Sequence, residues 1–232
     1  MAVVLHFLAV VVVTLMPALG VRAATDELMA ERVMGNPDAP VTIIEYSSLT
    51  CPHCADFHIQ TLPKLKAAYI DTGKVRLIFR DFPLDPRALS AAMVARCVEP
   101  NRYFGFLEVL FRDQETWAVS NDPVRELKVR ARLAQLSEAA FNACLANEEL
   151  AKAITEKAKR AHEQEGVRST PIFFIGDRTL RGAYPFEDFK SVIDAALDGG
   201  ASQAPRQPDG GSQQEGAFSR MGQALKQWWR SE

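Results

Sequence analysis

The sequence predicts an α/β fold in which the sheet-forming part of the chain is interrupted by a long helical segment. Short segments rich in β-branched residues occur near both ends of the chain, at 41–46, 75–80 and 171–175. The pattern between the first two is helical, and the roughly eighty residues of 84–165 contain no convincing strand pattern. An α/β unit is therefore begun, interrupted by helices and then completed.

The composition agrees with a globular chain of one or two domains. The protein has 232 residues, of which 47% are hydrophobic and 24% are charged, which excludes wholesale disorder, collagen and coiled coil. The 27 basic and 29 acidic residues give a net charge of -2, so no basic excess favours nucleic acid as a partner. Four cysteines are too few for a small disulfide scaffold.

The first half of the α/β unit is expected to be a strand, a helix and a second strand. A polar, turn-rich segment over 24–40 leads into the strand 41–46. A helical pattern follows over 52–69, in which Pro63 should kink or break the helix. The second strand covers 75–80, and the three elements together predict a right-handed βαβ unit.

The interrupting segment is expected to hold five helices, at 86–98, 101–113, 122–135, 137–145 and 147–164. Asn147 and the acidic residues after it are suited to begin the last of them. The chain then returns to β structure at 171–175, turns at Gly176-Asp177 and forms a hairpin partner over 179–181. A final helix is expected over 185–197.

The N-terminal residues 1–23 have the features of a signal peptide. An almost unbroken apolar run covers 2–16 and is followed by Pro17 and by small residues around Arg22. The run has the length of a signal-peptide core rather than of a membrane-spanning helix. Because no Lys or Arg precedes it, an uncleaved membrane anchor is the alternative. Export would place the protein in an oxidising compartment, where disulfides persist.

The residues after the last helix are expected to form two parts. Residues 201–216 are rich in Gly, Ser, Gln and Pro and predict a flexible linker. Residues 217–232 predict an amphipathic tail with an apolar stripe at helical spacing, formed by Phe218, Met221, Leu225, Trp228 and Trp229. A weak contact of this stripe with a membrane surface, or with a partner, is one interpretation. Packing on the domain and a frayed end are the alternatives.

The motif Cys51-Pro52-His53-Cys54 lies at the junction of the first strand and its helix. Pro52 suits the first helical position, where no N–H group is needed. Cys51 then faces the free N–H groups and the positive end of the helix dipole, which favour its thiolate. A charged His53 would add to this effect.

A low pKa at Cys51 would act in two ways. It keeps the sulfur ionised for nucleophilic attack, and it makes the sulfur a good leaving group in thiol–disulfide exchange. Because the stabilised thiolate exists only in the reduced protein, the site would be oxidising. Cys54, one turn further into the helix, is expected to be less exposed and to act as the resolving thiol.

Other uses of the motif have less support. Haem attachment requires a His directly after the second cysteine, where Ala55 stands. Zinc requires four ligands, and Cys51, Cys54 and His58 would supply three. A structural disulfide across two intervening residues is a further alternative, although it would stabilise the fold very little.

Two segments together resemble the DsbA-like thiol–disulfide oxidoreductases of the thioredoxin superfamily. The first is Val41–His58, which contains the cysteine motif, and the second is Gly166–Ile175 followed by Arg181-Gly182-Ala183. The resemblance covers about 36–198 and implies a thioredoxin fold interrupted by an inserted all-helical domain. The implied division is a signal peptide 1–23, thioredoxin-fold halves 24–83 and 166–200, a helical insert 84–165, a linker 201–216 and a tail 217–232.

The resemblance also implies roles for residues around the motif. The Thr170-Pro171 peptide bond would be cis and would lie beside the disulfide, with Thr170 offering its backbone to an extended substrate and Pro171 shaping the substrate groove. Glu45 would be a buried acid that relays protons to and from the buried cysteine; a strand glutamate facing solvent is the alternative. His53 would tune Cys51, because a Pro-His dipeptide is linked to oxidising members.

The remaining cysteines, Cys97 and Cys144, both fall in the helical insert. Among the three ways of pairing four cysteines, a Cys97–Cys144 bridge beside Cys51–Cys54 leaves the active motif working. Some DsbA-like proteins carry a second, structural disulfide in this domain. Two separate buried thiols are the alternative.

The sequence therefore predicts an exported, periplasmic thiol–disulfide oxidoreductase that donates disulfides to reduced, unfolded proteins through Cys51 and Cys54. The enzyme is expected to need no metal or diffusible cofactor and to be reoxidised by a membrane redox partner, as in the family. Because 24–36 is too short for a dimerisation stalk, a monomer is expected. A reductase or isomerase of the same fold and a metal-handling or chaperone protein that uses its thiols as ligands are the alternatives.

Overall fold

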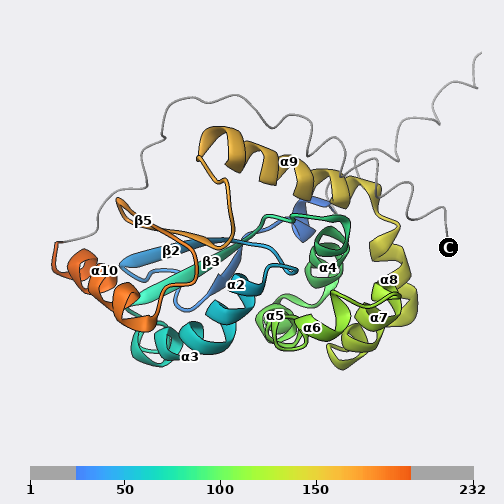
Figure 1. Ribbon diagram of the computed structural model, residues 1–232, viewed down its shortest axis with the longest axis horizontal. Coiled ribbons are helices and arrows are strands. Elements are labelled where there is room, and N and C mark those ends of the chain that lie inside the picture. The colour runs from blue at the N-terminus through green and yellow to red at the C-terminus, as the bar shows by residue number, and fades with distance from the viewer. Residues whose placement is uncertain (1–24, 200–232) are drawn as a thin grey trace, which may run out of the picture.

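The computed structural model describes residues 25–199, which form one five-stranded sheet with helices on both of its faces (Figure 1). The α/β fold class is confirmed, with a helical block between the third and fourth strands. The predicted signal peptide 1–23, linker 201–216 and tail 217–232 lie outside the described residues. Within 25–199, no helix is both long and apolar enough to cross a membrane.

The sheet has the strand order β1-β3-β2-β4-β5. β2 (Val41–Ser47) and β3 (Val75–Asp81) are parallel neighbours, as a strand–helix–strand unit requires. β4 (Ile172–Ile175) runs antiparallel to β2 and forms the predicted hairpin with β5 (Arg178–Arg181). The carboxyl end of β2, where the cysteine motif begins, therefore lies between the ends of two other strands.

β1 (Arg32–Met34) corrects the prediction of an irregular lead-in over 24–40. Its three residues pair antiparallel with Leu77–Phe79 of β3. Three residues are too few to show an alternating pattern. The strand forms because the edge of β3 offers unpaired backbone groups, which is a feature of the folded sheet rather than of the local sequence.

One continuous helical segment joins β2 to β3 and has four parts: α2 (Pro52–Asp56), η1 (Phe57–Thr61), α3 (Leu62–Leu65) and η2 (Lys66–Ile70). η1 and η2 are π-helical. Pro63 does not break the helix, because it lies in the first turn of α3 directly after η1, where its missing N–H is tolerated. The helix predicted over 52–69 is therefore present, with a π-helical turn before Pro63.

The helical block consists of α4 (Pro86–Cys97), η3 (Pro100–Arg102), α5 (Tyr103–Arg112), α6 (Gln114–Trp117), α7 (Pro123–Leu133), α8 (Glu138–Leu145) and α9 (Glu148–Gln164). α4 is its central element, because residues 88–96 are all buried and α5, α7, α8 and α9 pack against them. The helix predicted over 101–113 is present as α5, and α6, which was not predicted, follows it as a separate short helix. The separation follows from Asp113, whose backbone (φ −96°, ψ 12°) leaves the helical region.

Polar side chains begin four of these helices. Asp85, Asp122, Ser137 and Asn147 each accept a hydrogen bond from the backbone N–H three residues later. Such a cap satisfies an N–H group that has no partner within the helix and contributes about 1 kcal/mol. The starts of these helices therefore follow from local sequence chemistry.

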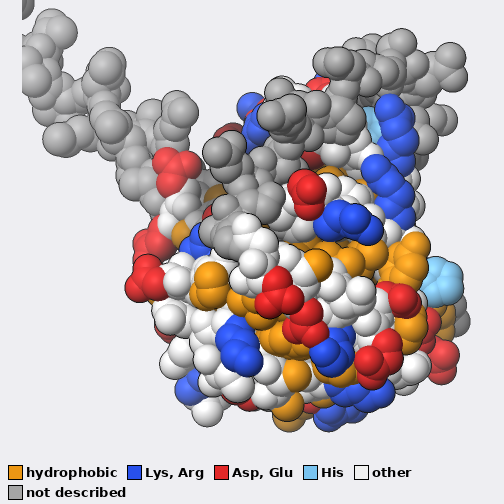
Figure 2. Space-filling view, turned by 90° about the vertical axis from the view of Figure 1, so that its left-hand side faces the viewer, with side chains coloured by type: hydrophobic (Ala, Val, Ile, Leu, Met, Phe, Trp, Pro, Cys, Tyr) orange, Lys and Arg blue, Asp and Glu red, His pale blue; other side chains and the backbone are white. Residues whose placement is uncertain are grey.

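Different helices cover the two faces of the sheet. The α2–η2 segment and α10 (Phe186–Asp198) pack on one face, against alternate strand residues such as Ile43 and Leu77. The C-terminal half of α9 packs on the other face through Ala158 and Ala161. At the end of the molecule that carries α10, hydrophobic atoms reach the surface between charged side chains (Figure 2).

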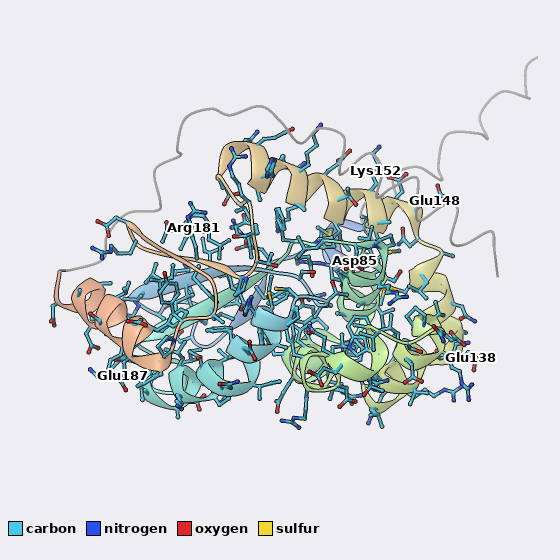
Figure 3. The ribbon with its side chains drawn as sticks, in the orientation of Figure 1. Asp85, Glu138, Glu148, Lys152, Arg181 and Glu187 are labelled. Carbon is cyan, nitrogen blue, oxygen red and sulfur yellow. A yellow bond between two sulfur atoms is a disulfide. The ribbon has the colours of Figure 1, made fainter. Side chains whose placement is uncertain are left out.

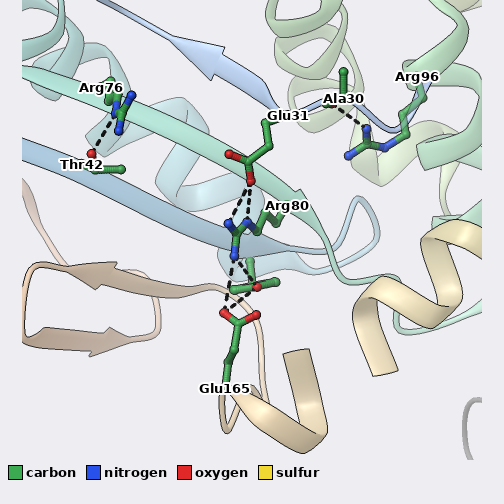
Figure 4. A network of polar contacts seen from close by, with 8 residues as sticks. Ala30, Glu31, Thr42, Arg76, Arg80, Arg96 and Glu165 are labelled. Atoms are coloured by element: carbon green, nitrogen blue, oxygen red, sulfur yellow. Dashed lines mark hydrogen bonds and ion pairs between the residues drawn. The ribbon is translucent and has the colours of Figure 1, made fainter. Parts of the chain in front are cut away.

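Arg80 joins three segments that are distant in the sequence (Figure 4). Its guanidinium donates to Glu31 at 2.8 Å and to the Tyr46 hydroxyl at 2.8 Å, and it forms an ion pair with Glu165 at 3.5 Å. The N-terminal segment, the sheet and the end of α9 are thereby linked on one side of the sheet.

Arg96 attaches the insert to the sheet. Its side chain is buried, its Nε lies 2.5 Å from Oδ2 of Asp81 at the end of β3, and it also donates to the carbonyl oxygens of Leu28 and Ala30. Removal of either partner of a buried ion pair leaves a charge without compensation. The position of α4 relative to β3 is therefore strongly constrained.

Cys97 and Cys144 form a disulfide that joins the last residue of α4 to α8. Both ends of the bridge belong to the insert, so it constrains the insert without involving the motif cysteines. Cys51 and Cys54 are free thiols in this structure.

We predict that the double substitution Cys97→Ala, Cys144→Ala lowers the free energy of unfolding by about 2–4 kcal/mol. The bridge spans a sequence separation of 47 residues, and closing a loop of that size removes entropy from the unfolded chain. Urea unfolding of the variant and of the wild type measures the difference, with the Cys51–Cys54 disulfide formed in both. Equal stabilities would contradict the prediction.

Candidate active site

Cys51 begins α2 at the carboxyl end of β2. It is the N-cap residue, with extended backbone angles (φ −84°, ψ 119°), and Pro52 occupies the first turn of the helix. The carbonyl oxygen of Cys51 accepts hydrogen bonds from the N–H groups of Cys54 at 3.1 Å and Ala55 at 3.2 Å. Cys51 therefore lies at the positive end of the helix, where an anion is favoured.

The two cysteines of the motif differ in their access to solvent. Cys51 is 8% exposed and Cys54 is 0% exposed. Cys54 lies one turn into the helix, on the side that packs against the end of β2. Of the two sulfur atoms, that of Cys51 is therefore the one that a second molecule can reach.

The surroundings of Cys51 lower the pKa of its thiol from 9.0 to about 5. The largest cause is a hydrogen bond from the Cys54 thiol, while burial opposes the shift. Hydrogen bonding from the Thr170 side chain and from the backbone N–H groups of Cys54 and His53 also favours the thiolate. The helix terminus contributes as the sequence predicts, but the neighbouring thiol contributes more.

Cys54 has the opposite tendency. Burial raises the pKa of its thiol, and the adjacent Cys51 raises it further. The Ser47 side chain and the backbone N–H of Ser48 favour the thiolate and offset part of this rise. When one proton is present for the two sulfurs, it therefore resides on Cys54.

The peptide bond between Thr170 and Pro171 is cis, and it lies beside the sulfur. The Cys51 Sγ is 3.3 Å from the carbonyl oxygen of Thr170. The Thr170 hydroxyl is buried and makes no well-formed hydrogen bond within residues 25–199, so it is available to the sulfur. The carbonyl oxygen of Pro171 accepts a hydrogen bond from the Gly182 N–H at 2.8 Å, which fixes this loop against the end of β5.

Glu45 is fully buried, so the alternative of a solvent-facing glutamate is wrong. Its Oε1 lies 2.9 Å from Nε2 of His58 in η1, while its Oε2 has no hydrogen-bond partner among the described residues. His58 is itself buried and stacks on Phe111 of α5, with ring centroids 4.1 Å apart.

The pairing of His58 with Glu45 bears on the zinc alternative. The histidine that would have supplied the third ligand beside Cys51 and Cys54 is bonded to a carboxylate instead. Throughout residues 25–199, no group of three or more His, Cys, Asp or Glu side chains is placed to hold a metal ion. His58 is therefore engaged with Glu45 rather than placed as a third ligand beside the two cysteines.

The His53 side chain faces solvent. It is 73% exposed, and its Nδ1 lies 3.5 Å from Oδ2 of Asp56. Hydrogen bonding from the backbone N–H of His53 lowers the pKa of Cys51. Tuning of Cys51 by the imidazole ring stays a prediction.

Two residues of the insert hold the loop that precedes Cys51, and neither was predicted. Gln114 Nε2 donates to the carbonyl oxygens of Leu49 at 2.8 Å and Cys51 at 3.1 Å. The Thr50 hydroxyl donates to Asp85 at 2.5 Å, and Asp85 also caps α4 near the middle of the molecule (Figure 3). A glutamine and a capping aspartate carry no motif that would relate them to a distant cysteine.

Comparisons with known proteins agree with this geometry. A family model described as thioredoxin matches residues 27–195. The crystal structure of Wolbachia pipientis alpha-DsbA1 is similar with a TM-score of 0.70 and 36% identity, covering 73% of this chain and 92% of that one. The crystal structure of a protein-disulfide isomerase from Novosphingobium aromaticivorans gives a TM-score of 0.62 and 28% identity, covering 72% and 97%.

A curated relative from Rickettsia bellii, provisionally named a protein-disulfide oxidoreductase, is 28% identical over 169 residues. The match covers 72% of this chain and 65% of that relative, so the chain spans slightly less than two thirds of the relative's length. The range matched by the family model includes Glu45, both motif cysteines and the Thr170-Pro171 bond.

We predict that the ultraviolet absorbance of thiolate in the reduced protein titrates with a midpoint at about pH 5, because Cys51 ionises there. The Cys51→Ser variant should lack this transition. A single transition near the ordinary value of 9.0 in the wild type would show that the site does not stabilise the Cys51 thiolate.

The same shift predicts a pH-dependent stability of the reduced protein. The folded pKa of Cys51 lies below its unfolded value of 9.0, so ionisation of this thiol contributes stability that is fully present above pH 9.0 and is lost as the pH falls towards about 5. The free energy of unfolding of the wild type, relative to Cys51→Ser, should therefore increase as the pH rises from about 5 to 9.0. Urea unfolding at several pH values measures it, and a constant difference would contradict the prediction.

Proposed function

The chain belongs to the DsbA-like family of the thioredoxin superfamily, and from this premise we propose that it is a protein thiol–disulfide oxidoreductase that donates disulfides to reduced, unfolded proteins. The observation that carries the proposal is the unequal pair of sulfurs in the motif. Cys51 is at the helix terminus with a pKa lowered to about 5, and Cys54 is fully buried with a raised pKa. This is the arrangement that directional thiol–disulfide exchange requires.

In the proposed reaction, the oxidised protein carries a Cys51–Cys54 disulfide. A substrate thiolate attacks the sulfur of Cys51, the bond between the two protein sulfurs breaks, and its electron pair passes to Cys54, which takes up a proton. A second substrate thiolate then attacks the substrate sulfur of the mixed disulfide, and Cys51 leaves as a thiolate. The substrate gains a disulfide, and the protein is left as a dithiol.

The low pKa of Cys51 supports donation over reduction. A thiolate stabilised in the folded protein stabilises the reduced form of the enzyme, and an enzyme whose reduced form is stabilised is an oxidant. DsbA is a strong oxidant for this reason, and the lowered pKa of Cys51 extends the same relation to this chain. A reductase or isomerase of the same fold is the alternative that this electrostatic arrangement disfavours.

Substrate binding is assigned to the loop that carries the cis bond. The carbonyl oxygen of Thr170 lies 3.3 Å from the Cys51 sulfur, so the main chain of an extended peptide joined to Cys51 could pair with the Thr170 backbone. Pro171 shapes the groove beside it. Glu45 takes part in proton transfer to and from Cys54, and His53 tunes Cys51.

The family resemblance supports further parts of the proposal. The protein would be exported to the periplasm, act as a monomer on unfolded substrates, and be reoxidised by a membrane redox partner without a metal or diffusible cofactor. A metal-handling function lacks a specific supporting observation, since His58 is engaged with Glu45.

The proposed function is tested with reduced, unfolded ribonuclease as substrate. We predict that the oxidised protein restores ribonuclease activity and that Cys51→Ser abolishes this, because Cys51 is the sulfur that substrate reaches. The variant Cys54→Ser, first converted to a Cys51–glutathione mixed disulfide with oxidised glutathione, should release glutathione when a ribonuclease thiolate attacks Cys51 and should form a mixed disulfide with ribonuclease, visible on a non-reducing gel. The variant Cys97→Ala, Cys144→Ala, which also lacks two thiols but outside the motif, is the matched control and should remain active.

The equilibrium with glutathione decides the direction of the reaction. In mixtures of reduced and oxidised glutathione that leave an ordinary protein disulfide oxidised, Cys51 and Cys54 of a disulfide donor should be mainly in the dithiol form. If the protein instead remains oxidised there and fails to restore ribonuclease activity, the donor assignment is wrong and the reductase alternative takes its place.

A further inference from the structure

The helical insert reaches the main chain of Cys51 through Gln114, the first residue of α6. Gln114 is 5% exposed, and its Nε2 donates to the carbonyl oxygens of Leu49 at 2.8 Å and Cys51 at 3.1 Å. An amide nitrogen carries two hydrogen atoms, so the side chain uses both of them on this loop. Figure 1 shows α5 and α6 beside α2.

The start of α2 has no cap of its own. Four helices of the insert begin with a side chain that accepts a hydrogen bond from the backbone N–H three residues later, whereas Cys51 forms no such bond. A capping side chain helps to hold the N-cap residue in its extended conformation. The conformation of Cys51 therefore has to be held by contacts with its main chain.

The position of the Cys51 sulfur depends on one of the two soft rotations of its backbone. The angle ψ, about the bond from Cα to the carbonyl carbon, is 119°. It sets the direction of the side chain relative to the carbonyl group and to the helix that follows. The N–H groups of Cys54 and Ala55 hold this carbonyl oxygen from the helix, and Gln114 holds it from the insert. Gln114 therefore restrains the angle that places the sulfur at the helix terminus.

The insert holds three consecutive residues of the loop. Gln114 binds the carbonyl oxygens of Leu49 and Cys51, and the hydroxyl of Thr50 between them donates to Asp85 at 2.5 Å. Asp85 begins α4 and Gln114 begins α6. The loop therefore cannot turn without breaking contacts with two helices of the insert.

α6 is itself fixed, so Gln114 has a firm base. Oδ2 of Asp113, directly before α6, accepts a hydrogen bond from Nε of Arg130 in α7 at 3.1 Å. Trp117, the last residue of α6, is fully buried, and its Nε1 donates to the carbonyl oxygen of Leu110 in α5 at 2.7 Å. The glutamine is thus anchored to α5 and α7 while its amide group reaches the loop.

The contact should matter most in the reduced protein. In the oxidised protein the disulfide ties Cys51 to Cys54 and itself restricts the conformation of Cys51. When the disulfide opens, this restraint is lost and the main-chain contacts remain. Both cysteines are free thiols in this structure, so the bonds from Gln114 are those of the reduced form.

We propose that Gln114 is a positioning residue for Cys51. It holds the N-cap conformation in which the sulfur faces the N–H groups at the start of α2, and it thereby stabilises the reduced form of the protein relative to the disulfide form. Gln114 acts through the main chain of Cys51 rather than through its sulfur. The proposal rests on the proposed function in that Cys51 and Cys54 are taken as the redox pair.

The test uses the full-length protein with Gln114→Met, which keeps a side chain of similar length and removes both N–H donors. We expect the midpoint of the thiolate absorbance of Cys51 in the reduced variant to lie about half a pH unit to one pH unit above that of the wild type, the effect of losing one hydrogen bond between neutral groups. The reason is that the freed sulfur faces the helix N–H groups for less of the time.

The equilibrium with glutathione should change in the same direction. In one glutathione mixture near neutral pH, the ratio of disulfide to dithiol in Gln114→Met should be about three to ten times that of the wild type, because the reduced form loses stability. Urea unfolding should show a larger loss of stability in the dithiol form than in the disulfide form, since the two measurements belong to one thermodynamic cycle.

Two further variants complete the test. Gln114→Leu is a second apolar replacement with a different shape; it should move both readouts in the same direction, and it carries the test if Gln114→Met does not fold. Ser90→Ala is the matched control, because it removes a buried hydroxyl of the insert that is bonded to the carbonyl oxygen of Pro86 within α4. It should leave the midpoint and the glutathione ratio at their wild-type values.

A purely structural role of Gln114 would lower the stability of both redox forms equally. An unchanged midpoint and an unchanged glutathione ratio in the Gln114 variants would therefore overturn the proposal, and so would equal shifts in Ser90→Ala. Failure of the wild type to restore ribonuclease activity would instead overturn the proposed function, and the comparison of midpoints between the wild type and Gln114→Met would still decide the role of Gln114.

Discussion

The active site depends on one electrostatic constraint: two sulfur atoms three residues apart must prefer opposite protonation states. Cys51 lies at the start of α2, where backbone N–H groups favour an anion, and Cys54 lies one turn further in, where burial favours the neutral thiol. The two preferences reinforce each other, because the hydrogen bond from protonated Cys54 is the largest cause of the low pKa of Cys51. The reactivity of the outer sulfur is therefore set partly by the burial of the inner one.

The helical insert helps to maintain this difference, although it lies outside the sheet that carries the motif. Gln114 holds two carbonyl oxygens of the loop around Cys51, and Asp85 both caps α4 and accepts the Thr50 hydrogen bond. The buried ion pair of Arg96 with Asp81 fixes α4 on β3. A shift of α4 would therefore move the loop that places Cys51 at the helix terminus, so the insert supports the geometry of the reactive sulfur as well as covering it.

The parts of the structure that follow from neighbouring residues could be predicted from the sequence, and those that depend on distant contacts could not. Pro52 after Cys51 indicates a helix start because its chemistry is local, and Asn147 indicates the start of α9 for the same reason. β1 was missed because three residues become a strand only when another strand offers its edge. The Thr170-Pro171 bond is cis in the structure, but trans is the strong default for X–Pro bonds, so only the family resemblance implied it.

Glu45 and His58 show the same limit from inside the active site. The sequence shows that Glu45 and Ser47 are two residues apart on a strand and so share one face of the sheet, and that Cys54 and His58 are one helical turn apart. It does not show that this face of the sheet and this side of the helix meet. Stability alone does not explain such a pair, since apolar side chains of similar size would pack among Phe79, Phe111 and Phe173 without the penalty of burying polar groups. The buried pair of carboxyl group and imidazole therefore has a cost in stability, and its place on the sheet side of the motif follows from the contact of η1 with β2 rather than from a local sequence signal.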